Sequence, residues 1–250
     1  MRPHSTTRAD PAVWAGVFGV AALAWALTAR LVGEAMMGGP TMGRSMGGFL
    51  AVWTLMMVAM MLPSVAPLVD IYAHGLRRSA RGPRLFARAI GLVAGYLAVW
   101  AVFGLAAFAF GCGAERVVRN APAAAPWVAA GLLALVALYQ LTPIKNRCLT
   151  HCRSPLGFLL RLGHLRGPLR DVRVGLSHGS YCVGCCWGLM VALLVLGVMD
   201  IAWMAVLAAV VLLEKTWRYG RRLSLVFAVV LFVLACAIPL DPDLAAGLRR

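Results

Sequence analysis

The sequence predicts an all-α fold: a polytopic bundle of transmembrane helices with its N-terminus in the cytoplasm. Three features predict it, namely a hydrophobic content of 62%, a charged content of only 13%, and a series of long apolar runs. Soluble domains are about 45–50% apolar and about 25% charged. The composition therefore excludes a water-soluble globular enzyme, a disordered chain and a nucleic-acid-binding domain, and it predicts a single integral membrane domain over residues 1–250.

Seven apolar segments provide the predicted helices, because a bilayer core requires about 20 apolar residues per helix. They are residues 13–32, 47–69, 89–111, 126–141, 183–198, 201–213 and 223–240. We expect the second segment to end near Pro63 and Pro67. The first has no clear signal-peptide cleavage site and is expected to remain as an anchor. Little separates the fifth segment from the sixth, so five or six crossings are the alternatives.

The basic residues give this topology an orientation. The chain carries 24 Lys and Arg against 9 Asp and Glu, a formal net charge of +15. With the N-terminus inside, 18 of these 24 basic residues fall on the inner side, and the excess alternates from loop to loop. Cytoplasmic loops carry such an excess. We therefore expect the basic loops to contact the anionic headgroups of the lipid bilayer and not nucleic acid.

Methionine is concentrated in two places. Met36, Met37, Met42 and Met46 lie in the first outer loop. Four more, Met56, Met57, Met60 and Met61, lie inside the second apolar segment. At 100° per residue these four share one helix face, within an arc of about 140°. Thioethers favour Cu(I) and need no deprotonation, so this face is a candidate metal-ligating surface. The alternative is that these methionines only fill the core.

The cysteines form two groups, both expected at the inner ends of helices. Cys148 and Cys152 would share a face if their segment is helical. The second group contains Cys182, Cys185 and Cys186, with His178 and Met190 on nearby helical positions. Cytosolic thiols stay reduced, and thiolates bind Cu(I), Zn or an iron–sulfur cluster. Basic neighbours are expected to lower the pKa of these thiols. His151 is a further imidazole on this side.

The remaining candidates are more ambiguous. Cys112 and Cys236 lie in the outer half of the predicted bundle, where they either pack or form a disulfide with each other. Glu214 and Lys215 close the sixth segment. They form either a local ion pair near the interface or a proton or cation site, since ionisable groups at membrane depth are costly.

The segments WTLMMVAMMLPS (53–64), TPIK (142–145) with its two following cysteines, and YCVGCCWGLM (181–190) carry a resemblance to a known family. Together with GVM (197–199), WM (203–204) and EK (214–215), they resemble the bacterial predicted metal-binding integral membrane proteins, a family of unknown function. The resemblance spans about residues 47–215. It implies metal binding and a multi-pass protein of the bacterial inner membrane, and it implies no established substrate or reaction.

Three functional hypotheses follow from the sulfur pattern. In the leading one the protein handles Cu(I), by uptake, relay or delivery, with a metallochaperone or a membrane metalloenzyme as partner. The second is thiol–disulfide electron transfer through Cys182 and Cys185. The third is a structural zinc site in a membrane scaffold, in which Cys148, Cys152, Cys182 and Cys185 hold one ion. No pattern of catalytic residues is present, so the sequence assigns no reaction.

Overall fold

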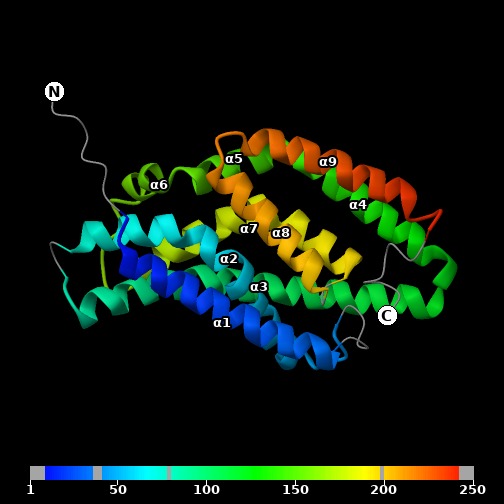
Figure 1. Cartoon of the computed structure of the whole chain (residues 1–250), viewed down its shortest axis with the longest axis horizontal. Coiled ribbons are helices and arrows are strands. Elements are labelled where there is room, and N and C mark those ends of the chain that lie inside the picture. Colours follow the sequence, from blue (N-terminus) through cyan, green and yellow to red (C-terminus); the bar gives the residue numbers. More distant parts are fainter. Residues whose placement is uncertain (1–8, 36–40, 78–79, 198–199, 242–250) are drawn as a thin grey trace.

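The structure is a computed structural model that describes residues 9–35, 41–77, 80–197 and 200–241. These residues form helices and no strands, which confirms the predicted all-α fold (Figure 1). The helices are α1 (Pro11–Ala35), α2 (Met46–Leu76), α3 (Pro83–Asn120), η1 (Pro122–Ala124), α4 (Ala125–Leu141), α5 (Pro143–Arg153), α6 (Pro155–Arg161), α7 (Arg170–Leu196), α8 (Ile201–Thr216) and α9 (Gly220–Ala237).

Six helical segments among the described residues are long and apolar enough to cross a membrane. They lie in α1, α2, α3, η1 with α4, α7 and α9. Helix α8 has 16 residues and is therefore about 24 Å long, which is shorter than a bilayer core. Figure 1 shows that α8 nevertheless runs back between α7 and α9, so the chain reverses direction there. The fifth and sixth predicted segments are thus two separate helices, divided at Gly197 (φ +138°).

Two predicted boundaries are wrong. Helix α2 continues through Pro63 and Pro67 to Leu76, and prolines of this kind are tolerated in membrane helices. Next to Pro63, the Ser64 hydroxyl donates to the Met61 carbonyl at 2.7 Å, and the Tyr96 hydroxyl reaches the same oxygen at 3.5 Å, so polar contacts lie beside the first proline. Helix α7 begins at Arg170 instead of near residue 183, so the second cysteine group lies in the middle of a helix and not at its inner end.

The early start of α7 follows from its contact with α3. A Cβ atom on Gly175 would lie 2.0 Å from the Leu92 carbonyl oxygen, and one on Gly95 would lie 2.3 Å from the Val172 carbonyl oxygen. Glycine at both positions lets the two backbones touch, as in the small-residue interfaces of membrane helices. The apolar stretches of α2 and α7 are 67% buried, whereas those of α1, α3, α4 and α9 are 22–33% buried.

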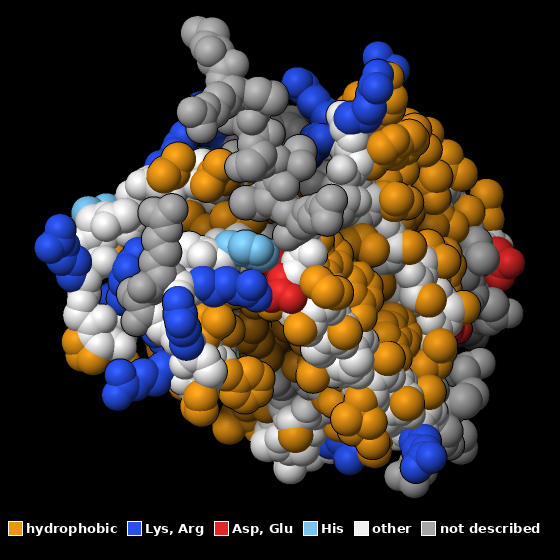
Figure 2. All heavy atoms as spheres, turned by 60° about the vertical axis from the view of Figure 1, so that its left-hand side comes forward, with side chains coloured by type: hydrophobic (Ala, Val, Ile, Leu, Met, Phe, Trp, Pro, Cys, Tyr) orange, Lys and Arg blue, Asp and Glu red, His pale blue; other side chains and the backbone are white. Residues whose placement is uncertain are grey.

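The two ends of the bundle differ in composition. The ends of the helices on the left of Figure 1 are joined by the segments that carry most of the Lys and Arg, including α5 and α6. Figure 2, with this end turned toward the viewer, shows basic side chains gathered on one side and a broad apolar flank beside them. The positive-inside rule predicts that this end faces the cytoplasm.

Candidate metal centre

Three cysteine sulfurs of α7 form the centre of the site. The Sγ atoms of Cys182, Cys185 and Cys186 all lie within 4.8 Å of one another, and all three side chains are buried. The Cys185 and Cys186 sulfurs are 3.2 Å apart, and the Cys185 thiol also donates to the Cys182 carbonyl at 3.2 Å. All seven cysteines are free thiols, so Cys112 and Cys236 form no disulfide.

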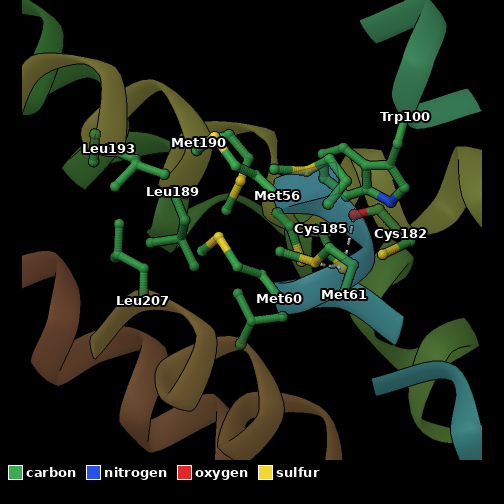
Figure 3. Close-up of a cluster of buried hydrophobic side chains, with 14 of the residues drawn as sticks. Met56, Met60, Met61, Trp100, Cys182, Cys185, Leu189, Met190, Leu193 and Leu207 are labelled. Atoms are coloured by element: carbon green, nitrogen blue, oxygen red, sulfur yellow. Dashed lines mark hydrogen bonds between the residues drawn. The ribbon is translucent and has the colours of Figure 1, made fainter. Parts of the chain in front are cut away.

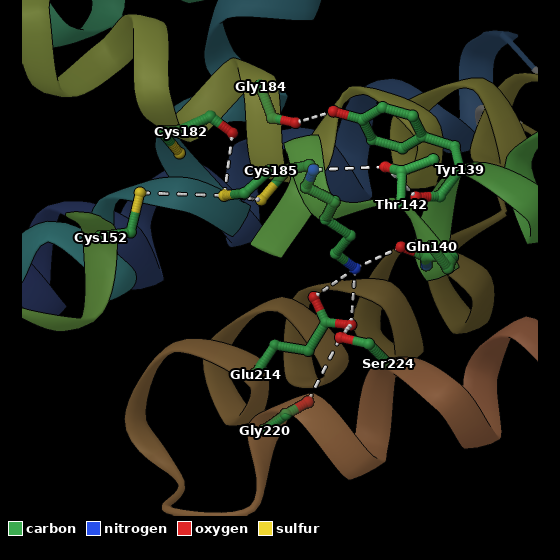
Figure 4. Close-up of polar contacts among 12 residues, drawn as sticks. Tyr139, Gln140, Thr142, Cys152, Cys182, Gly184, Cys185, Glu214, Gly220 and Ser224 are labelled. Carbon is green, nitrogen blue, oxygen red and sulfur yellow. Dashed lines mark hydrogen bonds and ion pairs between the residues drawn. The ribbon is translucent and has the colours of Figure 1, made fainter. Parts of the chain in front are cut away.

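A fourth sulfur reaches this group from α5. The side chain of Thr142 caps this helix, and Pro143 occupies its first turn, where a proline is well tolerated. The helix directs Cys152 toward α7, where its Sγ lies 3.8 Å from the Sγ of Cys185 (Figure 4). The α5 segment predicted from the Cys148–Cys152 spacing is therefore helical, and it brings one of its two thiols to the α7 cluster.

Cys148 occupies a separate place beside Gly184. A Cβ atom at Gly184 would lie 2.7 Å from the Cys148 sulfur, so the thiol packs directly against the α7 backbone. Burial raises the pKa of Cys148, which is the opposite of the effect expected from its basic neighbours. Cys148 lies outside the group of sulfurs that are mutually within 4.8 Å.

The methionine face of α2 lies next to the cysteines. Met56, Met57, Met60 and Met61 are each at most 2% exposed, as is Met190 of α7. Figure 3 shows Met56, Met60, Met61 and Met190 together with Cys182 and Cys185 in one buried cluster between α2, α7 and α8. Because α7 starts earlier than predicted, thioethers and thiols share one level of the bundle instead of occupying successive levels.

The outer methionine loop is only partly described. Met36 and Met37 lie outside the described residues. Met42 is buried and belongs to the hydrophobic core, whereas Met46 is exposed at the start of α2. Of the two described loop methionines, Met46 therefore lies outside the buried core.

Polar side chains from three other helices surround Cys182. The Lys215 ammonium of α8 donates to the Cys182 sulfur at 3.0 Å and to the Ser64 hydroxyl at 2.9 Å. The hydroxyl of Tyr96, from α3, lies 3.0 Å from the same sulfur. The sequence offered no signal for Tyr96, because an isolated tyrosine in an apolar helix is typical of packing.

Glu214 is paired with a residue of another helix, so the alternative of a local Glu214–Lys215 ion pair is wrong. Its carboxylate accepts two hydrogen bonds from the Lys145 ammonium, at 2.8 and 2.9 Å, and a third from the Ser224 hydroxyl at 2.7 Å (Figure 4). Lys145 also donates to the side chain of Gln140. This buried pair holds α5, the helix that carries Cys152, against α8.

The donor set fits a soft metal ion. Thiolates and thioethers select Cu(I), while thiolates also bind zinc. Residues 50–238 match the model of the PpoB2 family, which is described as a copper chaperone. The chain belongs to this family. No curated protein and no solved structure matches the chain.

The match to the PpoB2 family covers more of the chain than the resemblance noted in the sequence. It extends beyond α8 to include α9, and it contains all the sulfur donors described above as well as Tyr96 and Lys215. The family, the cysteine triad and the six apolar segments together support a membrane metal-binding protein. They are also consistent with a multi-pass location in a membrane.

The two histidines singled out by the sequence have different surroundings in this PpoB2 family member. His178 lies one helical turn before Cys182 and is buried, and its Nδ1 has no hydrogen-bond partner among the described residues. Its ring packs near those of Tyr96 and Phe158. By contrast, His151 is stacked on Tyr181, with ring centroids 4.2 Å apart, and its Nδ1 contacts the Arg147 carbonyl. His178 is thus the buried imidazole of the two, and it lies outside the group of ligand atoms that are mutually within 4.8 Å.

Proposed function

We propose that this protein is an integral membrane carrier of Cu(I), which it holds on cysteine and methionine sulfur and passes to a partner protein. The observation that carries the proposal is the clustering of the α7 thiols with Cys152 and the α2 methionines, within a family described as a copper chaperone. Copper is the cargo in this proposal. The proposed donors are Met56, Met57, Met60, Met61, Cys152, His178, Cys182, Cys185, Cys186 and Met190, with Cys148 as an accessory thiol.

The arrangement suits transfer better than permanent storage. Cys185 lies between a thiol of its own helix, Cys186 at 3.2 Å, and a thiol of another helix, Cys152 at 3.8 Å. Thiolates at such spacing would allow Cu(I) to exchange one ligand at a time without release into the bilayer. Cys152 is on a short helix at the basic end of the molecule, so we propose that copper is exchanged with a metallochaperone or a membrane metalloenzyme at the cytoplasmic face of the inner membrane.

A Cu(I) titration tests the proposal. Purified full-length protein in detergent should withdraw Cu(I) from a chromophoric Cu(I) chelator with sub-micromolar affinity. Replacing Cys182, Cys185 and Cys186 with serine should abolish this binding. The matched control replaces Cys112 and Cys236, which lie outside the cluster, and should bind as the wild type does. A wild-type protein that cannot compete for Cu(I), or a triple serine variant that binds as tightly as the control, would exclude the proposed function.

The methionines are tested separately. Met56→Leu/Met60→Leu/Met190→Leu should weaken Cu(I) binding, because leucine preserves the apolar volume and removes the thioether. Met46→Leu is the matched control, since Met46 is exposed and lies at the start of the same helix. If both variants bind alike, Met56, Met60 and Met190 only fill the core and are not ligands.

Zinc is the second candidate cargo or structural ion, because the α7 triad and Cys152 together offer four thiols, as a closed zinc site requires. Elemental analysis of protein purified from cells separates this case, which requires stoichiometric zinc. The electron-transfer alternative requires a reversible disulfide. It is excluded if Cys182 and Cys185 remain reduced under every redox condition tested.

A further inference from the structure

The buried ammonium of Lys215 is the feature that the sulfur donors alone do not explain. Lys215 is 7% exposed, and its two hydrogen-bond acceptors are the Cys182 sulfur at 3.0 Å and the Ser64 hydroxyl at 2.9 Å. Among the described residues, Lys215 forms no ion pair with a carboxylate. The neighbouring Glu214 is paired with Lys145 instead. An isolated buried cation is costly, so its position against a sulfur requires a reason.

Charge balance supplies that reason. Cu(I) held by two thiolates forms a unit with a net charge of −1, and such a unit would be unfavourable among the buried methionines and leucines of Figure 3. The ammonium of Lys215 touches one of the three clustered sulfurs, that of Cys182. The two charges together make the loaded site neutral.

We infer that Lys215 is the built-in counter-charge of the copper site, a positioning residue that acts through Cys182 to let a negatively charged Cu(I)–thiolate unit form inside the bundle. The inference rests on the proposed function. Ser64 and Tyr96 have supporting parts: Ser64 orients the ammonium, and Tyr96 directs its hydroxyl to the same sulfur. Such outer contacts commonly tune the affinity of a metal site.

The test compares Cu(I) affinities of the full-length protein in detergent, measured by competition with a chromophoric Cu(I) chelator. Lys215→Met removes the charge and should weaken binding about 100-fold or more, because it leaves a buried charge uncompensated. Lys215→Arg retains the charge and should stay within about tenfold of the wild type. In the Cys182→Ser background, Lys215→Met should have little further effect, because the contact through which it acts is already lost.

A matched control removes a different positive charge near the end of α8. Arg222→Met deletes an exposed guanidinium that lies over the Tyr219 ring, and it should leave the Cu(I) affinity within about tenfold of the wild type. If Lys215→Met fails to fold, Lys215→Gln takes its place, because glutamine retains a hydrogen-bond donor without the charge. The same loss of Cu(I) affinity, about 100-fold or more, is then expected.

Three results would overturn the inference while leaving the proposed function intact. Lys215→Met could bind Cu(I) as tightly as the wild type, or Lys215→Arg could lose as much Cu(I) affinity as Lys215→Met. The third result is that Lys215→Met lowers the Cu(I) affinity by the same factor in the Cys182→Ser protein as in the wild type. A wild-type protein that does not bind Cu(I) would overturn both.

Discussion

The Lys145–Glu214 pair should be the most sensitive polar contact in the bundle, and Glu214→Gln is the change that tests it. The Lys145 side chain is 0% exposed and that of Glu214 is 1% exposed. Water therefore cannot solvate the Lys145 ammonium when Glu214 loses its charge. Breaking a buried pair by removing one partner typically costs about 3–5 kcal/mol. We therefore expect Glu214→Gln to lower the free energy of unfolding by about 3–5 kcal/mol.

The double variant Lys145→Met/Glu214→Leu is the matched control. It removes both charges and leaves Gln140 and Ser224 without their main partners, although Ser224 retains the Gly220 carbonyl at 3.3 Å. The expected loss is then only about 1–3 kcal/mol, the cost of unsatisfied neutral groups. Reversible unfolding in mixed detergent micelles measures both variants. Equal stability of Glu214→Gln and the wild type, or a double variant less stable than the single one, would refute the reasoning.

Three further predictions concern the glycines and Cys148. Gly175→Ala should prevent the α3–α7 contact and yield misfolded protein by size-exclusion chromatography, whereas Gly131→Ala, with open space around its Cβ, should behave as the wild type. Gly184→Ala should destabilise the protein by about 1–3 kcal/mol through its clash with Cys148. Adding Cys148→Ala to Gly184→Ala should restore most of the lost stability. If the double variant is as unstable as Gly184→Ala, the close packing of Cys148 against position 184 is wrong. Burial raises the pKa of Cys148, so maleimide should label this thiol more slowly in the folded than in the unfolded protein at neutral pH. The labelling rate of the folded protein should increase as the pH rises. Equal labelling rates of Cys148 in the folded and the unfolded protein at neutral pH would argue against its burial.

Periodicity predicted two local features of the candidate site correctly. The methionine face of α2 is buried, and the Cys148–Cys152 segment is helical, because both features depend only on local helical spacing. The start of α7 could not be found this way. Its first turns are polar and contain Gly175 and Gly179, which are typical of a loop until the close approach of α3 is known. The depth of the cysteine cluster was therefore misjudged.

The pairing of Glu214 and Lys215 shows a different kind of error. Adjacent residues on a helix do not face each other, so a local ion pair could have been excluded from the sequence once α8 was expected to be helical. Their true partners, Lys145 and Cys182, come from other helices and required the tertiary structure. Tyr96 likewise became visible only when α3 was placed against α7.

The position of α8 in the chain has a consequence for synthesis. Helix α8 is short and ends with a carboxylate and an ammonium, and such a segment is expensive to insert into a bilayer alone. Ser64, Lys145 and Cys182, which receive these two charges, all precede α8 in the sequence. When α8 leaves the ribosome these three partners have already been made, and Ser224 of α9, which also donates to Glu214, follows it. The order of the helices therefore allows α8 to enter the membrane with both charges neutralised, as the last part of the site to be completed.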